Sequence, residues 1–475
     1  MPERVTPGGE PITELALAEA FVTQHHAELR HVRLWRAWLH YAETHWQRDA
    51  TGAVERLFKD LLRGKITAAT TLEDDKARRT AVNQLLGCCT ARQVQAVLTL
   101  ASTEPEVAVL PEVFDADPWA LNLRNGTLDL RTGELHAHRR EALITKCAPT
   151  THDAAAACPR WEQFLQEIMG HNDAMVAFLS RAVGYTLTGT TTEQVLFFCH
   201  GSGQNGKSVF LETLADVLGP DYAVAAAFAT FLEQRRDGNA PSPDVARLRG
   251  ARLVSASEAP GGRSFDAVVL KELVGGDTMT ARFLRENPFQ FKPQFKLWLR
   301  ANHKPPVHEQ TVAFWRRMKV IPFSVTIPEP QRDHELHAKL LAEAPGILNW
   351  AVRGCLAWQR DGLGEPPDVR AATEAYRAEN DTIAEFLDAY CALEPHAWTA
   401  TSELYRAFTT WWERTHAKHE KPLTRAWFAR LLGERDGLRP EASGHAKTRG
   451  WRGVRLLDTP LALALTEEAA DDLPY

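Results

Sequence analysis

The chain of 475 residues is about three times as long as a typical domain, so two or three domains are expected. Apolar residues make up 44% and charged residues 24%, which is typical of a soluble globular protein and excludes a disordered or fibrous one. The formal net charge is −6, but residues 271–320 hold ten Lys or Arg against four Asp or Glu, and residues 401–455 hold twelve against six. Such basic regions on an acidic chain indicate either contact with a polyanion or chance clustering on solvated helix faces.

Membrane and disulfide chemistry are not expected. The longest apolar stretches, such as residues 223–232, are shorter than the ~18 residues that suggest a spanning helix. The first residues have neither a basic start nor an apolar core, so no secretion signal is predicted. Of the seven cysteines only Cys88 and Cys89 are neighbours, which predicts neither a disulfide framework nor a zinc site. A cytoplasmic location is the resulting expectation.

The first 160 residues are predicted to form a mostly helical domain with a small hairpin region. Residues 13–100 show helical spacing of apolar residues, and an aromatic group lies within one such segment: Trp35, Trp38, Tyr41 and Trp46. This group is either a core stripe or a base-stacking platform. Asn-Gly at 125–126 and Thr-Gly at 132–133 predict a hairpin within residues 117–136. Residues 161–192 are predicted to form a helical collar.

The strongest motif lies in residues 195–219. An apolar run, VLFFC, precedes Gly201-Ser202-Gly203-Gln204-Asn205-Gly206-Lys207-Ser208, and a helical pattern follows. This strand, glycine-rich loop and helix predict a phosphate-binding loop, because glycines let backbone N–H groups turn toward phosphate oxygens. Lys207 can reach the β- and γ-phosphates of ATP, and the Ser208 hydroxyl can bind Mg²⁺.

Three downstream segments could complete an ATP-hydrolysing site. The strand at 252–258 ends in Glu258, a candidate for orienting the attacking water or assisting the metal, with Asp266 and Glu272 as rivals. The strand at 295–302 ends in Asn302, which could sense the γ-phosphate or be only a turn residue. Arg316 and Arg317 precede another strand and could stabilise phosphoryl charge from a neighbouring subunit, or form a surface salt bridge.

Residues 270–299 are predicted to contain a basic and aromatic hairpin between these segments. Its candidate DNA-binding residues are Lys271, Arg282, Arg285, Phe289 and Lys292, with Lys296, Phe283 and Phe291 interleaved. Charge for phosphates and rings for bases are what a loop tracking single-stranded DNA requires.

The C-terminal part follows a predicted linker at residues 364–369. Residues 370–460 are predicted to form helix–helix–helix–hairpin, an order that suits a winged helix, and an acidic tail occupies residues 461–475. The predicted DNA contacts are Arg425 and Arg430 on the third helix and Lys447, Arg449, Arg452 and Arg455 on the wing. A partner-docking or ring-stabilising module with a basic face is the alternative.

The motifs GSGQNGKS, RLVSASE, KELVGGDTMTAR, FKLWLRANHKPP and AFWRRMKVIPF, in this order, resemble those of superfamily 3 helicases. The similarity is to the phage/plasmid primase-helicase branch, related to poxvirus primase-helicases. It implies an α/β fold with an AAA+-like ATPase core at residues 193–365, a hexameric ring, and ATP-driven 3′→5′ translocation on single-stranded DNA. It also assigns the acid to Glu258, the sensor to Asn302 and the trans finger to Arg316 or Arg317. One glutamate stands where many relatives have paired acids.

No primase domain is predicted. The Asp115-x-Asp117 pair could serve as a polymerase metal site, but no second acidic or histidine motif precedes it. A separate primase or initiator is therefore the expected partner, together with single-stranded and forked DNA. Two alternatives remain open, a DNA-binding replication initiator and an AAA+ NTPase switch that does not unwind DNA.

Overall fold

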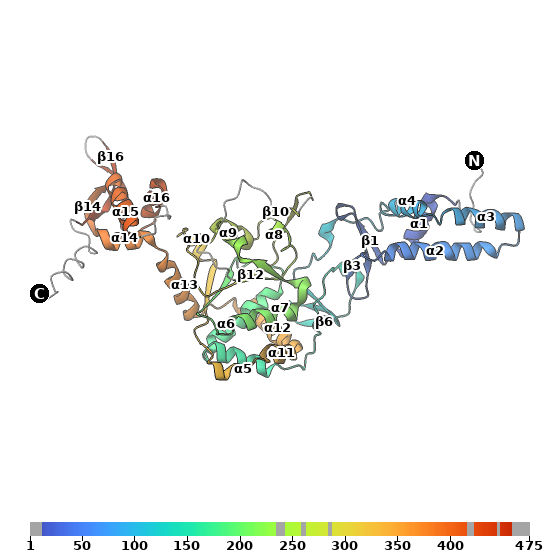
Figure 1. Ribbon diagram of the computed structural model, residues 1–475, viewed down its shortest axis with the longest axis horizontal. Coiled ribbons are helices and arrows are strands. Elements are labelled where there is room, and N and C mark those ends of the chain that lie inside the picture. Colours follow the sequence, from blue (N-terminus) through green and yellow to red (C-terminus); the bar gives the residue numbers. More distant parts are fainter. Residues whose placement is uncertain are drawn as a thin grey trace.

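The computed structural model describes residues 12–233, 243–257, 263–283, 287–415, 422–443 and 447–457. A central body carries an elongated N-terminal part on one side and a small C-terminal module on the other (Figure 1). Glu258, Arg285 and the predicted acidic tail at 461–475 lie outside the described residues.

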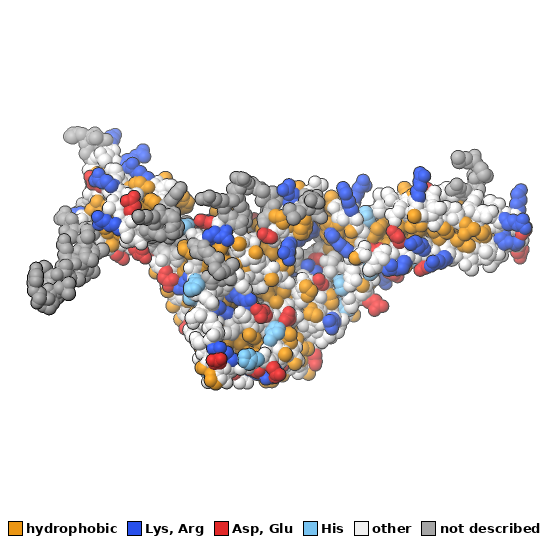
Figure 2. Space-filling view, in the orientation of Figure 1, with side chains coloured by type: hydrophobic (Ala, Val, Ile, Leu, Met, Phe, Trp, Pro, Cys, Tyr) orange, Lys and Arg blue, Asp and Glu red, His pale blue; other side chains and the backbone are white. Residues whose placement is uncertain are grey.

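The N-terminal part combines helices with a small sheet. Its helices are α1 (Glu14–His25), α2 (Ala53–Thr70), α3 (Asp75–Gly87) and α4 (Ala91–Ala101), and its antiparallel strands are β1 (Leu29–Val32), β2 (Ala37–Tyr41) and β3 (Trp46–Arg48). The helices share a core in which Phe21 and Phe58 meet edge to face, with ring centroids 5.6 Å apart. In the view of Figure 2, Lys and Arg side chains are spread along these helices and toward the central body.

The prediction that Trp35, Trp38, Tyr41 and Trp46 lie on a helix is wrong. Trp38, Tyr41 and Trp46 lie on the strands, and Trp35 ends the short 3₁₀ turn Arg33–Trp35. Arg36 follows with a φ of 48°, a left-handed conformation that reverses the chain into β2. Aromatic residues fit a half-buried pleated surface, so the pairing of β1 with β2 overrides the helical spacing.

The predicted hairpin within residues 117–136 is confirmed and gains a third strand. Strands β4 (Ala120–Leu123), β5 (Gly126–Asp129) and β6 (Glu134–His136) form an antiparallel sheet. Asn122 is fully buried there, and its side-chain nitrogen donates to the carbonyl oxygens of Thr44 and Lys146 at 3.1 and 2.9 Å. Its backbone N–H donates to the Tyr222 hydroxyl at 3.1 Å, which ties this sheet to the central body.

The central body is built on a five-stranded parallel sheet. Its strand order is β13-β7-β12-β9-β8, with bounds β7 (Leu196–His200), β8 (Ala223–Ala227), β9 (Leu253–Ser257), β12 (Lys296–Ala301) and β13 (Met318–Pro322). Alternate residues face opposite layers, because successive side chains in a strand point to opposite sides. Phe197 and Cys199 join one hydrophobic core, whereas Leu196 and Phe198 join the other. β8 was not predicted, because four of its five residues are alanine, which is depleted in strands.

Helices cover both faces of this sheet (Figure 1). One layer contains α5 (Pro159–Ile168), α6 (Asp173–Leu187), α7 (Lys207–Tyr222), α11 (Leu336–Leu341) and α12 (Ala344–Asp361), and the other contains α8 (Pro243–Ala246), α9 (Ala267–Gly275), α10 (Val312–Trp315) and α13 (Pro367–Glu379). Gly184 and Gly354 let α6 and α12 touch backbone to backbone: a Cβ on Gly184 would lie 2.0 Å from the Cys355 nitrogen.

The predicted hairpin after α9 is also present. Strand β10 (Met279–Ala281) pairs with β11 (Phe289–Phe291) in an antiparallel ribbon, and residues 284–286 of the intervening sequence lie outside the described ranges.

The C-terminal module has one strand more than predicted. Its order is α14 (Thr382–Tyr390), β14 (Cys391–Ala400), α15 (Thr401–Thr415), α16 (Arg425–Gly433), β15 (Arg439–Ser443) and β16 (Thr448–Leu456), and β16 lies between the other two strands. Glu394 and Trp398 flank a register shift, which breaks the alternation that would have predicted β14. α13 packs on β13, where the Thr373 hydroxyl accepts the Val320 N–H at 3.1 Å, so the body extends beyond the predicted linker at 364–369.

Among the described residues no helix combines the length and apolar character needed to cross a bilayer.

Candidate nucleotide-binding site

The glycine-rich loop leaves the sheet where the strand order reverses. β7 lies between β12 and β13, the fourth and fifth strands in chain order. In open parallel sheets the crevice beyond the carboxyl ends of the strands, at such a switch point, is where ligands bind. The loop therefore emerges at the position that the topology favours for a ligand.

The loop backbone adopts conformations that depend on glycine. Gly203 and Gly206 have φ values of 102° and 81°. A Cβ on Gly206 would lie 2.5 Å from Ile168 of α5, so this position also needs the absence of a side chain. α7 starts at Lys207, and no side chain caps its N-terminus. A long helix that presents uncapped N–H groups beside glycines fits a phosphate group.

The Lys207 side chain is held inside the loop. It is 5% exposed, and its Nζ donates to the Gly201 carbonyl at 2.6 Å and to the Asn205 side-chain oxygen at 3.1 Å. Asn205 is itself fixed, because its Nδ2 donates to the Phe323 carbonyl at 3.0 Å. These contacts preorganise the ammonium group within the loop.

Asn302 lies beside this lysine. It follows β12 directly, and its Oδ1 accepts a hydrogen bond from Lys207 Nζ at 3.1 Å. The fold thus brings together two residues that the sequence singled out separately.

The predicted acid, Glu258, lies outside the described residues. Ser257, immediately before it, ends β9 at the same edge of the sheet and pairs with Arg300. Arg300 also contacts Glu212 of α7, with Nη1 2.8 Å from Oε1. The rivals are structural or peripheral: Asp266 caps α9 by accepting the Val268 and Val269 N–H groups at 3.1 Å, and Glu272 is exposed.

Arg316 and Arg317 lie at the opposite edge of the sheet. β13 begins at Met318, which pairs with Leu196 at the amino end of β7, whereas the loop leaves the carboxyl end of β7. Arg316 donates to the Gln194 side chain at 2.9 Å, and burial lowers the pKa of Arg317. Neither arginine can reach a phosphate in its own loop, since about four strand residues of ~3.3 Å each separate them.

Arg332 belongs to no recognisable motif, and the fold places it against the loop. Its guanidinium donates to the Gln204 side chain and, at 3.1 Å, to the Ile327 carbonyl. The Ile327 N–H in turn donates to the Gln204 carbonyl at 2.9 Å. Arg332 lies after β13, the last strand of the parallel sheet in chain order. Only the tertiary structure brings this segment to the loop.

The hairpin residues fall into three groups. Arg282 and Lys292 are exposed, and Phe289 stacks on Phe283, with centroids 5.5 Å apart and planes at 24°. Lys271 lies on α9 instead, with Nζ 2.8 Å from both carboxylate oxygens of Glu309. Arg285 lies outside the described residues.

The prediction that Lys296 tracks DNA is wrong. Lys296 is 1% exposed at the start of β12, where its Nζ donates to the carbonyl oxygens of Thr188 and Thr190 at 2.5 and 2.9 Å. It also lies 4.4 Å from the Tyr185 ring centroid. Burial holds the pKa of Lys296 well below its usual value. This lysine links residues 188–190, which follow α6, to the sheet through hydrogen bonds.

The C-terminal cations fall into an exposed group and an ion-paired group. Arg425, Arg430, Lys447 and Arg449 are exposed, although Arg430 covers the Trp427 ring at 4.8 Å and lies 3.5 Å from Glu434. Arg452 and Arg455 form ion pairs with Glu441 and Glu394, so these two are engaged within the sheet.

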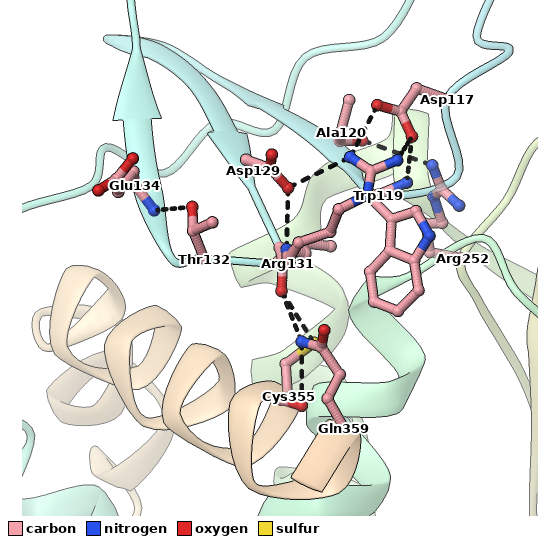
Figure 3. A network of polar contacts seen from close by, with 11 residues as sticks. Asp117, Trp119, Ala120, Asp129, Arg131, Thr132, Glu134, Arg252, Cys355 and Gln359 are labelled. Atoms are coloured by element: carbon pink, nitrogen blue, oxygen red, sulfur yellow. Dashed lines mark hydrogen bonds and ion pairs between the residues drawn. The ribbon is translucent and has the colours of Figure 1, made fainter.

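The carboxylates of Asp115 and Asp117 bind different protein groups. Asp115 accepts hydrogen bonds from Thr145, whereas Asp117 pairs with Arg131, Nη2 to Oδ1 at 2.9 Å. Figure 3 shows Arg131 between Asp117 and Asp129, beside the Trp119 ring. Within the described ranges no three His, Cys, Asp or Glu side chains converge on a metal position.

Comparison with known families matches two regions of the chain. Residues 18–170 match the family "D5 N terminal like", and residues 199–317 match the "Family of unknown function (DUF5906)". The second region includes the glycine-rich loop, Asn302 and both arginines before β13.

Curated viral relatives are distant and longer. "Putative helicase L207/L206" of Acanthamoeba polyphaga mimivirus is 26% identical over 326 residues, covering 64% of this chain and 34% of the relative. "Putative helicase 022R" of Frog virus 3 is 28% identical over 252 residues, covering 49% and 26%. "Putative primase C962R" of African swine fever virus is 24% identical over 332 residues, covering 63% and 34%. The chain thus spans about a quarter to a third of these proteins.

Solved structures share the fold. The apo structure of the NrS-1 C-terminal region, residues 305–718, aligns with a TM-score of 0.52, covering 94% of this chain and all of that one at 12% identity. Another form of the same region aligns with a TM-score of 0.51.

Proposed function

We propose that this protein is an ATP-dependent DNA helicase motor that translocates on single-stranded DNA as a ring. The contact between Lys207 and Asn302 carries the proposal. Both residues lie in the crevice that the strand order favours for a ligand, which supports Lys207 as the phosphate-binding cation and Asn302 as the γ-phosphate sensor. The viral relatives named as helicases support the same activity.

Each residue near the loop has a proposed task in hydrolysis. The loop amides and Lys207 bind the β- and γ-phosphates, and Asn302 orients Lys207 and the γ-phosphate. Glu258 positions the attacking water. Ser208, exposed at the start of α7, would hold Mg²⁺ together with Glu258, and the ion would neutralise charge on the phosphates. Arg332 supports the loop through Gln204.

The position of the two arginines supports a ring. Because Arg316 and Arg317 lie at the edge opposite the loop, they could assist hydrolysis only at a neighbouring subunit. We infer a homo-oligomer, with six subunits as the resemblance to superfamily 3 implies, and an AAA+-like core.

DNA contact is proposed for two regions. Arg282, Arg285, Phe289 and Lys292 on the β10–β11 hairpin supply charge and rings for a single strand. The C-terminal module has the helix and strand order of a winged helix, whose Arg425, Arg430, Lys447 and Arg449 would contact forked or duplex DNA. We leave Lys271 out of this proposal, because it already forms an ion pair with Glu309. A primase or initiator would be a separate partner.

Strand displacement with 3′-tailed and 5′-tailed duplexes tests the proposal. ATP-dependent unwinding of the 3′-tailed substrate alone is the expected result, with Lys207→Ala inactive and the exposed-lysine variant Lys339→Ala active. Hydrolysis stimulated by single strands without displacement would favour the initiator. ATP hydrolysis that DNA does not stimulate would favour an NTPase switch.

A further inference from the structure

The hairpin and the N-terminal part are joined by a stack of aromatic rings and an arginine. The Arg249 guanidinium lies 5.5 Å from the Trp35 ring centroid and 5.4 Å from that of Phe289. Trp35 belongs to the turn between β1 and β2, and Phe289 begins β11. Cations within ~6 Å of a ring face are attracted to it, so Arg249 bridges two separate parts of the molecule.

The stack continues on both sides of Arg249. Phe283 stacks on Phe289 and is 38% exposed at the hairpin. On the other side Trp35 stacks on Phe114, with centroids 5.8 Å apart, and the Arg48 guanidinium lies 4.8 Å from the Trp35 ring. The rings thus form a row that starts on the hairpin and ends at Phe114, directly after the 3₁₀ turn Pro111–Val113.

Exposed cations flank both halves of this row. They are Arg33, Arg36 and Arg48 beside Trp35, Arg247 before β9, and Arg282 and Lys292 on the hairpin. In the residues that the structure describes, none of these six forms an ion pair with a carboxylate. Figure 2 shows Lys and Arg side chains where the N-terminal part meets the central body.

A solvated helix face does not explain this arrangement. Arg33 and Arg36 lie in a tight turn whose exposed residues include Leu34, 73% exposed, next to Trp35. Arginines that pair with no carboxylate among the described residues, together with partly exposed rings, are typical of a surface that binds single-stranded nucleic acid through stacking and charge.

We infer that the junction between the β1–β2 turn and the β10–β11 hairpin is a continuous path for single-stranded DNA, in which Trp35, Arg33 and Arg36 extend the grip of the hairpin onto the N-terminal part. This inference rests on the proposed function, because it is the single-stranded DNA bound by the β10–β11 hairpin that continues over Trp35. Bases stack on the exposed Phe283 and contact the part-exposed rim of Trp35, whose ring already packs against Phe114 and Arg48. The flanking arginines contact phosphates.

The test measures binding of oligothymidylates of about 4–16 nucleotides by fluorescence anisotropy across salt concentrations. The double variant Arg33→Gln, Arg36→Gln should bind the longer oligonucleotides more weakly, and the salt slope should fall by about 0.7 for each phosphate that the variant no longer neutralises. Trp35→Ala should weaken binding by ~5-fold or more, whereas Trp35→Phe should keep most of the affinity of the unsubstituted protein. Arg92→Gln, an exposed arginine on α4, is the matched control and should change neither quantity.

Photo-crosslinking with iodouracil-substituted strands gives a second measurement that does not depend on variant stability. Crosslinks in peptides containing Trp35 as well as Phe283 are expected. The inference is overturned if the double variant binds like Arg92→Gln and crosslinks map to the hairpin alone. That result would leave the proposed DNA contact of the hairpin intact. If Phe289→Ala and Lys292→Gln also bind normally, the proposed DNA contact of the hairpin fails as well. Tighter binding of oligouridylate through the same residues would overturn DNA as the ligand.

Discussion

Lys207 and Asn302 are 95 positions apart in the chain, and Lys207 Nζ lies 3.1 Å from Asn302 Oδ1. The contact exists because β7 and β12 are adjacent and parallel, so the residues after them emerge at the same edge. An amide oxygen that holds the ammonium in place can reduce the reorganisation needed when phosphate charge develops.

Hydrolysis should depend on these residues in different ways. Lys207→Ala is expected to abolish ATP hydrolysis, because the phosphates are left without their cation. Asn302→Ala should lower kcat by roughly 10²–10³, the usual effect of removing one preorganised polar group. Glu258→Gln should bind ATP without turning it over. Steady-state ATPase and nucleotide-binding assays check all three, and a Glu258→Gln variant with parental turnover would disprove that assignment.

Arg316 and Arg317 should act between subunits. An Arg316→Ala, Arg317→Ala chain and a Lys207→Ala chain should each be inactive alone. Mixed rings should recover part of the ATPase activity, because some interfaces pair an intact loop with intact arginines. Subunit exchange is verified by labelled chains. Fully exchanged mixtures that stay inactive would contradict a finger acting in trans.

Lys296 should be needed for folding rather than for DNA binding. Lys296→Met leaves the Thr188 and Thr190 carbonyl oxygens without this donor and should lower the free energy of unfolding by about 2 kcal/mol. Chemical denaturation measures this decrease, with the exposed Lys292→Met as control. DNA affinity should show the opposite pattern to stability. The folded Lys296→Met protein should bind DNA normally, whereas the stable Lys292→Met protein should bind it weakly. Weak binding by folded Lys296→Met would restore a tracking role.

The Lys271–Glu309 pair should give an acid-sensitive contribution to stability. Partial burial alone would raise the pKa of Glu309, but hydrogen bonds from Lys271 and Thr311 outweigh it and hold the pKa below its usual value. The unfolded state then binds the proton more readily, so the contribution is complete above pH ~4.3 and is lost as pH falls through the folded-state pKa.

A double-mutant cycle with Lys271→Met and Glu309→Gln measures this pair. We expect a coupling energy of about 1 kcal/mol at neutral pH that disappears in acid. A coupling energy that is independent of pH would contradict the charge interaction.

The C-terminal cations should affect forked DNA specifically. Replacing Arg425, Lys447 and Arg449 by Gln should weaken binding to forked duplexes and lower the salt slope, and should spare hydrolysis stimulated by single strands. Arg452→Gln is the control, since Arg452 already pairs with Glu441. Equal effects of the triple variant and the control on fork binding would favour a partner-docking module.

The local sequence was sufficient for the glycine-rich loop, the strand ends and the hairpin turns, because those features depend on neighbouring residues. Gly203 and Gly206 adopt positive φ values that glycine permits at little cost. The Asn-Gly signal correctly located the hairpin, in which Leu123 of β4 pairs with Gly126 of β5 across a two-residue turn. The same local signals were misleading for Trp38 and Trp46, whose strand conformation depends on cross-strand partners.

Long-range packing decided the rest. Lys271 and Lys296 are equivalent in a basic, aromatic sequence, yet one forms an ion pair on α9 and the other is buried in β12. Arg332 and Arg249 carry no motif, and they acquire partners only when distant segments come together. Sequence specifies which chemical groups are present and how each short segment turns. Tertiary structure decides which of them meet, because burial and pairing depend on residues far away in the chain.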